Sequence, residues 1–389
     1  MKIKCAFFTI LTTFFVLTIN SNTVAVDTRG IDAVLKKSNI DDQDKKIIDD
    51  FLAQAVEELV KTKDFTSIAQ VRSVILSRKG TQSEYARQFS ESAYRHIQAG
   101  FELAQTLRPQ ERINNVIISL MILIDGLEDL RLADLAIGRL QDQNMVIRYW
   151  AVHSLTNPAI VQQLKSGTTS NPELARAIIE RLKEIVPTSK PEIIVHIARF
   201  ATNINIPDGE ELLLQVADDR IKRYADWTVT IEFYDAIILK LLESKIPLPS
   251  QSAGIITQTT TPNKPAVSRC FAQLYSFVIQ RYIKGDNVLN ETQKNNLASV
   301  IIEIEEKCIT RLLGLSRSQG TLRRAIERND LAALSDEHNK LLGGETSTGQ
   351  LPSKLSFDYS TTTDGPKRSA PIPLPDKPQK IEANNQKVS

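Results

Sequence analysis

Apolar residues recur along most of the chain at intervals of three and four, which is the spacing of one face of an α-helix. The clearest run follows Asp41 and Asp42, whose short acidic side chains are typical of a helix start. Comparable runs continue to residue 124, with breaks at Gly80 and Pro109. The pattern predicts consecutive amphipathic helices. In the first run the apolar positions are Ile47, Ile48, Phe51, Leu52, Ala55, Val56, Leu59 and Val60.

Prolines punctuate the chain beyond this point, each where a new apolar face begins. The resulting elements have about 10 to 18 residues and lack strands between them, which is typical of stacked helical hairpins. We therefore expect an all-α fold, an α-solenoid. Residues 229–233 alternate like a strand, but 227–241 fits the helical period over a longer span and is expected to be a helix. The punctuating prolines are Pro158, Pro172, Pro187 and Pro191.

Changes in composition divide the chain into segments. Residues 26–246 form the expected helical repeat domain, and 247–266, rich in proline and hydroxyl side chains, form a linker to a C-terminal helical unit at 267–343. The remainder, 344–389, has six prolines and few apolar residues, so we expect a disordered tail with polyproline conformation around 371–375. Such a tail is either a solvated tether or a docking segment for a partner.

The first 25 residues have the character of an export signal. Lys2 and Lys4 precede an acid-free apolar run, and residues 23–25 supply small side chains before a cleavage point. The apolar run, residues 5–19, is shorter than the roughly 20 residues that span a bilayer, which favours cleavage over a permanent anchor. No later segment of the sequence has the length and apolarity of a membrane span. We therefore expect a periplasmic or secreted mature chain.

The charge balance gives no support for nucleic-acid binding, which normally depends on a concentrated basic face. The chain has 48 basic and 46 acidic residues, and the signal-like segment contains two lysines and no acid, so the mature chain has 46 of each. Cys270 and Cys308 remain after cleavage, on two helices expected at 269–284 and 291–313. They could form a disulfide or remain two small buried side chains, and the sequence favours neither.

The segment 128–165 carries the most specific pattern in the chain. A short apolar helix is followed by an aspartate in the turn, and then by an aliphatic residue with arginine, an alanine and a leucine on the next helix. An aspartate in the turn can cap the next helix and pair with an arginine, and alanine lets helices approach closely. The positions are Asp142, Ile147, Arg148, Ala151 and Leu155.

This pattern resembles the HEAT repeat. The resemblance implies an architectural role for the five residues, protein partners and no fixed chemistry. A fainter second unit follows, because the dipeptide Val-His at 152–153 recurs at 195–196, within the repeat length expected for this class. That second unit lacks the aspartate and the arginine, and Pro187 lies in its turn.

No motif identifies a reaction. The four histidines form no tight pair with one another or with cysteine, and serine-hydrolase, nucleotide-binding and dinucleotide-binding patterns are absent from the sequence. We therefore assign no catalytic, cofactor-binding or metal-binding residue. If the repeats align, His153 and His196 lie on one ridge with Glu192 a turn away, although histidines with local hydrogen bonds are the simpler interpretation. The other two histidines are His96 and His338.

Several remaining residues allow both a functional and a structural interpretation. Tyr149, Trp150 and Trp227 could form a partner-binding surface, because Trp and Tyr dominate binding hot spots, and packing between helices is the alternative. Asn290 begins a glycosylation sequon, but a helix cap is preferred. Adjacent carboxylates are expected on solvated helix faces or in first turns. These carboxylate pairs are Glu57-Glu58, Glu210-Glu211, Asp218-Asp219 and Glu305-Glu306.

These observations lead to the hypothesis of an exported, non-enzymatic α-solenoid that binds protein partners or acts as a scaffold without a cofactor. The alternatives are an envelope hydrolase acting on cell-wall or polysaccharide material, and a purely structural envelope component. Aromatic residues gathered on one ridge would favour binding, whereas acidic residues or histidines converging in a pocket would favour catalysis.

Overall fold

The computed structural model of the chain consists of two compact units, residues 1–96 and 97–389. The division falls within the helix α4 (Ser83–Gln105). The predicted export signal and most of the predicted linker lie outside the residues that the structure describes. The described residues are 26–165, 172–247, 264–360 and 367–377.

The first unit contains α1 (Arg29–Val34), α2 (Asp42–Lys61), α3 (Phe65–Leu76) and the beginning of α4. α2 opens with a reciprocal cap, in which the Asp41 carboxylate accepts from the backbone amide of Asp44 and the Asp44 carboxylate accepts from that of Asp41. Two of the otherwise unsatisfied amides at the helix start are thereby paired. The helix start predicted at Asp41 is confirmed.

A carboxylate joins α2 to α4 within this unit. Asp49 Oδ1 lies 2.9 Å from Ser92 Oγ, from Arg95 Nη2 and from His96 Nε2. Burial opposes the negative charge of Asp49, but the donors from His96 and Ser92 outweigh it and hold the pKa of Asp49 below its usual value. His96 is thus occupied in a structural contact.

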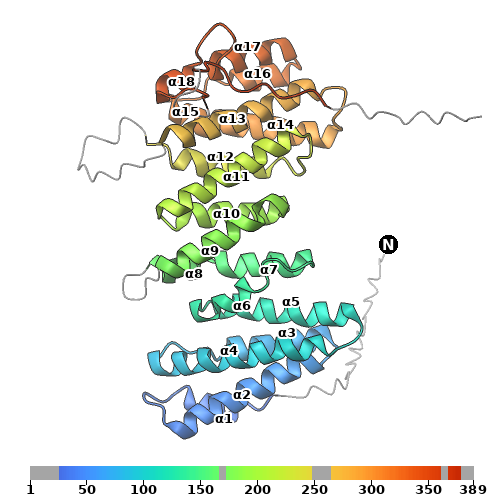
Figure 1. The fold of residues 1–389 in the computed structure, drawn as a ribbon, viewed down its shortest axis with the longest axis vertical. Helices are drawn as coiled ribbons and strands as arrows, with labels where there is room; N and C mark the ends of the chain where they lie inside the picture. Colours follow the sequence, from blue (N-terminus) through green and yellow to red (C-terminus); the bar gives the residue numbers. More distant parts are fainter. Residues whose placement is uncertain (1–25, 166–171, 248–263, 361–366, 378–389) are drawn as a thin grey trace, which may run out of the picture. The chain divides into compact units, whose positions relative to one another are not determined.

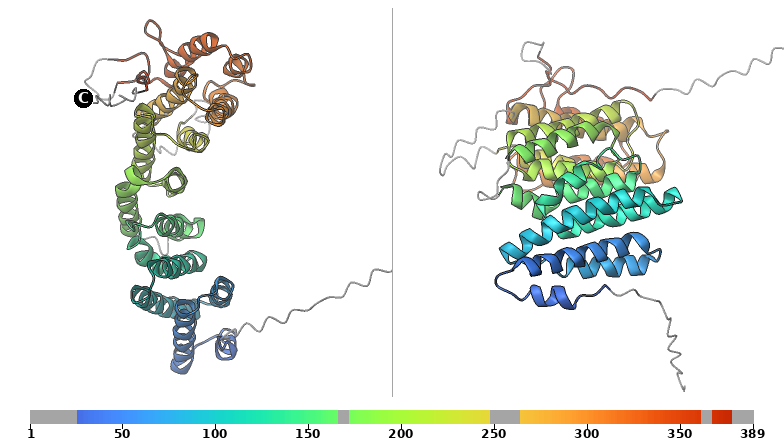
Figure 2. Two further views of the ribbon diagram at one scale, coloured as in Figure 1. Left: turned by 90° about the vertical axis from the view of Figure 1, so that its right-hand side faces the viewer. Right: turned by 60° about the horizontal axis from the view of Figure 1, so that its bottom comes forward.

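The second unit is a stack of helices in two layers (Figure 1; Figure 2, left). In one layer α5, α7, α10, α12 and α14 pack successively against one another, and in the other α9, α11 and α13 do so. Pairs such as α10 with α11 and α12 with α13 close the space between the layers. Their bounds are α5 (Gln110–Leu127), α7 (Met145–Thr156), α9 (Pro172–Ile185), α10 (Pro191–Asn203), α11 (Pro207–Ala225), α12 (Tyr234–Ser244), α13 (Lys264–Lys284) and α14 (Glu291–Ile304).

Shorter segments connect and extend the layers. The helix predicted at 291–313 is α14 continued by a π-helical turn, in which the hydrogen bonds widen by one residue. The short segments are η1 (Leu130–Leu132), α6 (Ala133–Ile137), α8 (Pro158–Lys165), η2 (Val186–Thr188), η4 (Glu305–Ile309), α15 (Thr310–Leu312), α16 (Thr321–Glu327), α17 (Leu331–Leu342) and α18 (Gln350–Leu355).

The predicted all-α solenoid class is confirmed for the described part of the chain. Every regular element there is helical, and its β pairing is limited to an isolated bridge between Gly344 and Ser347. The core between the layers contains fully buried aliphatic, small and aromatic residues, such as Ala151, Leu213 and Phe271. None of the described helices combines the length and apolarity that crossing a membrane requires.

The C-terminal helices continue the stack rather than forming a unit set apart by a linker. α13 begins at Lys264, before the predicted boundary, and packs against both α11 and α12. Its residues Phe271, Leu274 and Val278 are fully buried, so the apolar face of α13 completes the core of the preceding helices. The chain divides instead at residues 96–97.

The helix predicted at 227–241 begins only at Tyr234. Trp227 and Ile231 have positive φ angles of 56° and 57°, a backbone region that neither helix nor strand uses. The backbone amide of Thr228 donates to the carbonyl of Arg223 at 2.9 Å, which closes the end of α11. Residues 226–233 therefore form an irregular turn, and the strand-like alternation of residues 229–233 does not correspond to a strand.

Within the segment 344–389, predicted to be a disordered tail, the described residues include several packed anchors. Leu351 in α18 and Tyr359 are fully buried, and the Tyr359 hydroxyl donates to the carbonyl of Leu342 at 2.7 Å. Leu374 is also buried, on α13. The low average hydrophobicity of the segment does not indicate that these few apolar side chains are buried. Residues 361–366 and 378–389 lie outside the described part.

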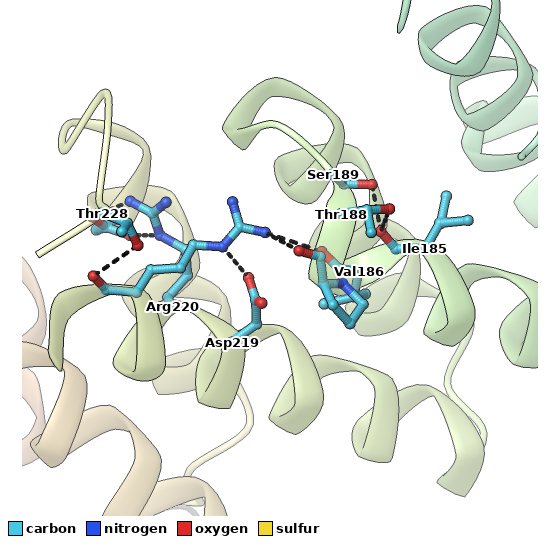
Figure 3. Close-up of polar contacts among 10 residues, drawn as sticks. Ile185, Val186, Thr188, Ser189, Asp219, Arg220 and Thr228 are labelled. Carbon is cyan, nitrogen blue, oxygen red and sulfur yellow. Dashed lines mark hydrogen bonds and ion pairs between the residues drawn. The ribbon is translucent and has the colours of Figure 1, made fainter. Parts of the chain in front are cut away.

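Polar contacts reinforce the second layer where α11 passes the turn after α9 (Figure 3). Arg223 pairs with Asp219 one turn earlier, at 2.7 Å, and its Nη2 donates to the backbone carbonyls of Val186 and Pro187 at 3.2 and 3.1 Å. These carbonyls follow the end of a helix, where backbone acceptors lack partners within the helix. The arginine therefore fastens α11 to the preceding hairpin.

The most deeply buried charges lie between α11 and α12. Arg220 donates from Nε and Nη2 to the two oxygens of Asp235 at 2.7 and 2.8 Å, and the Tyr224 hydroxyl donates to Asp235 at 2.7 Å. The side chains of Arg220 and Asp235 are 1% and 0% exposed. A bidentate pair with an added hydrogen bond is the geometry that best compensates for the loss of water around both ions.

Replacing Asp235 by asparagine is expected to lower the free energy of unfolding by about 3 to 5 kcal/mol, because it leaves the buried Arg220 guanidinium without a counter-charge. Urea unfolding followed by circular dichroism measures the loss. The double variant Arg220→Met/Asp235→Leu removes both charges and is the matched control, and we expect it to lose clearly less stability. Equal losses in the single and the double variant would contradict this account.

Candidate functional site

Two histidines from neighbouring helices meet on the layer formed by α5, α7 and α10. The ring centroids of His153 (α7) and His196 (α10) are 4.9 Å apart. Their predicted alignment on one ridge is confirmed. Tyr149 lies 5.8 Å from His153 and 5.5 Å from His196, and Trp150 lies 5.4 Å from His153, again between centroids. We call these four residues the α7–α10 cluster.

The helical period explains how α7 presents this cluster. Tyr149 and His153 are one turn apart and share a face, while Ile147, Ala151 and Leu155 lie on the opposite, fully buried side. All four cluster side chains are half-buried, so each has one side packed and one side open to water. The adjacent Tyr149 and Trp150 are both accommodated because their rings meet edge to face at 5.6 Å.

His153 is held by a carboxylate from the neighbouring helix. Its Nδ1 donates to Asp125 Oδ1 of α5 at 2.7 Å, and Asn157 Nδ2 donates to the same oxygen at 3.3 Å. The hydrogen bond to Asp125 raises the pKa of His153 above its ordinary value of 6.5, against the opposing effect of burial. The acidic partner is therefore Asp125, which lies in a different helix from the Glu192 that sequence spacing suggested.

His196 has the opposite tendency. Burial, followed by repulsion from a protonated His153, lowers the pKa of His196 to about 4. The cluster thus combines a histidine whose charged form is stabilised by Asp125 with one that is neutral near neutral pH. Neutral imidazole offers both a donor and an acceptor to a bound group. Within the described residues, histidine, cysteine and acidic side chains form no group of three suited to a metal ion.

The repeat-signature residues have architectural positions. Asp142 accepts from the backbone amide of Asn144 at 2.8 Å and lies 3.9 Å from Arg139, while the cap of α7 is Asn144, which accepts from Val146. The cap of α7 is therefore Asn144, and not Asp142 as expected from the sequence. Arg148 Nη1 lies 3.5 Å from the Thr188 hydroxyl in the turn before α10. Ile147, Ala151 and Leu155 are buried, as noted above.

Trp227, the third aromatic residue considered for partner binding, does not join the cluster. It lies in the turn between α11 and α12, where its Nε1 donates to the backbone carbonyl of Pro375 at 2.8 Å. The guanidinium of Arg281 lies 5.3 Å from the centre of its ring. Trp227 therefore already contacts a segment of this chain.

The expectation that the adjacent carboxylates are solvated is wrong for Glu305. Glu305 is 4% exposed and accepts from the backbone amides of Leu322 and Arg323 at 3.1 and 2.9 Å, so it caps α16 from another helix. Glu210 is 9% exposed in the first turn of α11, where burial raises its pKa, whereas Asp218 is exposed. A local sequence does not reveal such contacts, because the partner amides lie elsewhere in the chain.

The two cysteines are free and buried. Cys270 Sγ donates to Asp218 Oδ1 at 3.5 Å, and burial raises the pKa of the Cys308 thiol to about 12. Thiols of this kind are weak nucleophiles near neutral pH. The helix cap preferred for Asn290 is confirmed, because its side chain accepts from the Gln293 amide at 2.9 Å.

No protein-family model, curated protein or solved structure matches the chain. The fold itself defines a class, a helical solenoid built from packed helix pairs, and in the α7–α10 cluster partly exposed aromatic rings lie beside two titratable histidines. Fold alone assigns no chemistry to a solenoid.

Replacing His196 by glutamine is expected to reduce the loss of stability on acidification. The pKa of His196 is about 4 in the folded chain against an ordinary 6.5, so the unfolded chain takes up the proton first and stability falls as the pH falls between these values. At about pH 5 the variant should recover roughly 1 to 2 kcal/mol relative to the parent, allowing for partial exposure. Urea unfolding at a series of pH values measures this difference.

The matched control is His153→Gln, for which the sign is opposite. Because the folded pKa of His153 is raised, its contribution is fully present below about pH 6.5 and disappears as the pH rises through the folded value. This variant should therefore lose stability mainly at low pH. Parallel pH profiles for the parent and both variants would rule out the electrostatic description of the cluster.

Proposed function

We propose that this chain is an exported, non-enzymatic solenoid that binds other proteins and acts as a scaffold. The observation that supports this most strongly is the α7–α10 cluster, in which the partly exposed Tyr149 and Trp150 lie beside two histidines of different pKa. Tyrosine and tryptophan supply large contact areas with little loss of side-chain freedom, and they are enriched in binding hot spots. Val146, 48% exposed on the same helix, adds apolar area.

The polar groups near the cluster support binding over catalysis. Asp125 is engaged by both His153 and Asn157, so it is poorly placed to accept a proton from a substrate. His196 has a pKa of about 4, far from the range in which a general base works best near neutral pH. A neutral, half-buried imidazole is well suited to hydrogen bonding with a partner.

We also propose that the stack is HEAT-like around residues 128–165. The short helix α6, the turn with Asp142 and the buried Ala151 and Leu155 of α7 agree with that repeat. The departure is Arg148, which contacts Thr188 of the following turn rather than the aspartate. In this arrangement the signature residues hold neighbouring repeats together and leave the outer face of α7 for binding.

Export is expected to leave a mature chain that begins at Val26. Produced with its first 25 residues in a host with a general secretion pathway, the protein should be recovered outside the cytoplasm with this N-terminus, as determined by intact mass. Replacing Ala25 by aspartate should block cleavage, because the site requires a small neutral side chain. Recovery of uncleaved parent protein in the cytoplasm would remove export from the proposal.

Replacing both Tyr149 and Trp150 by alanine is expected to lower the affinity for an envelope protein by roughly tenfold or more, as hot-spot truncation does. The mature parent chain is immobilised and its partners are recovered from envelope extract. The affinity of each partner is then measured for the parent and for the double variant. The matched control is Phe65→Ala on α3, which removes an aromatic side chain that is 68% exposed outside the cluster. Recovery of no specific partner, together with turnover of wall fragments, would overturn the scaffold proposal.

A further inference from the structure

An extended segment of the C-terminal region, residues 371–376, lies against α13 and is the last coloured part of the chain in Figure 1. The Gln273 side-chain amide donates to the carbonyl of Ile372 at 3.0 Å and accepts from its backbone amide at 2.7 Å. Gln280 accepts from the backbone amide of Leu374 at 2.6 Å, and Lys284 donates to its carbonyl at 2.6 Å.

These contacts have the form of peptide recognition. Gln273, Gln280 and Lys284 are spaced by seven and four residues and so share one face of α13. They contact the backbone N–H and C=O groups of Ile372 and Leu374, which are every second residue of an extended chain. Hydrogen bonds to backbone groups are independent of the side chains of the bound segment, so they give affinity without fixing its sequence.

Selectivity comes from a small number of side chains. Leu374 is 1% exposed and Pro371 is buried, whereas Ile372 is 38% exposed. Asp376 pairs with Lys284 at 2.7 Å. The alternating prolines restrict the segment to an extended conformation before it binds, which lowers the entropic cost of docking. The preferred ligand therefore has a proline, a leucine three residues later and an acidic residue two further on.

Further contacts within the chain orient the side chains that bind residues 371–376. Gln280 also donates to the Ser276 hydroxyl at 2.7 Å, which lies 2.8 Å from His338 Nε2. Trp227, which donates to the carbonyl of Pro375, lies over the buried guanidinium of Arg281. Side chains that are already oriented lose little freedom when a ligand docks.

The chain's own segment leaves space beside it. A cavity of about 670 Å³ lies between α13, α17 and the segment, lined by Gln280, Lys284, His338 and Pro373 among others. This volume is in the range of sites that enclose small ligands or several side chains. A partner peptide with larger side chains than Pro371 and Pro373 could occupy space that the internal segment does not.

We propose that this surface binds an extended proline-containing peptide of a partner protein, and that residues 371–376 occupy it as an internal ligand. We call it the α13 groove; it is formed by Gln273, Gln280 and Lys284 of α13 together with Trp227 from the turn between α11 and α12. The groove is on different helices from the α7–α10 cluster, so it adds a second recognition surface to the proposed scaffold. A partner gains access by displacing the internal segment.

The test uses the full chain and a fluorescent peptide with the sequence of residues 367–377. Leu374→Asp removes the buried anchor of the internal segment and should free the groove, so this variant is expected to bind the peptide at least about tenfold more tightly than the parent, in which the tethered segment competes. Adding Gln273→Ala and Gln280→Ala to Leu374→Asp should weaken binding about tenfold or more. A peptide with aspartate in place of the leucine is the matched control and should not bind.

Equal affinities for the parent and Leu374→Asp, or binding unaffected by loss of the two glutamines, would overturn the proposal. A second measurement needs no variant: excess peptide should accelerate trypsin cleavage of the parent chain after Arg368, because it displaces the internal segment. An unchanged cleavage rate counts against the proposal. The proposal also fails if the parent chain is a dimer that the peptide dissociates, because the groove would then be occupied by the segment of a second copy of the chain.

Discussion

The buried ion pair between Arg220 and Asp235 is the constraint on which the C-terminal half of the second unit depends. A guanidinium and a carboxylate without water cost several kcal/mol each unless their geometry is nearly ideal. α11 and α12 must therefore meet at a fixed distance and angle, and the turn between them adopts two positive φ angles to allow it. Tyr224 completes the hydrogen bonds of Asp235, and Arg281 of α13 lies over the Tyr224 ring at 5.6 Å, so a single carboxylate organises three helices.

Several charged side chains of the second unit bind groups on other helices. Glu305 caps α16, Arg223 binds carbonyls after α9, and Asp125 orients His153. The contacts of Glu305 and Arg223 pair backbone donors and acceptors that helix ends leave unpaired. These ionisable groups therefore have structural roles in the described part of the chain.

The limits of prediction from sequence follow from how far apart the interacting residues are. Helix starts at Asp41 and Asn290 could be predicted because a cap involves residues three apart, and the His153 and His196 ridge could be predicted because a repeat length relates them. The carboxylate beside His153 could not, since Asp125 is 28 residues away in a different helix. Packed anchors within the tail, such as Leu374, could not be predicted either, because average composition hides single residues whose burial depends on remote parts of the chain.

The placement of the two tryptophans has a practical consequence. Trp150 lies in the α7–α10 cluster and Trp227 borders the α13 groove, and the chain contains no other indole. Each proposed recognition surface therefore carries its own intrinsic fluorophore. Trp150 has a histidine ring 5.4 Å away, whose protonation alters its emission, while Trp227 emits beside a permanent cation and hydrogen-bonded to the carbonyl of Pro375. Occupancy of the two surfaces can thus be separated optically in the unlabelled protein by replacing either tryptophan with phenylalanine.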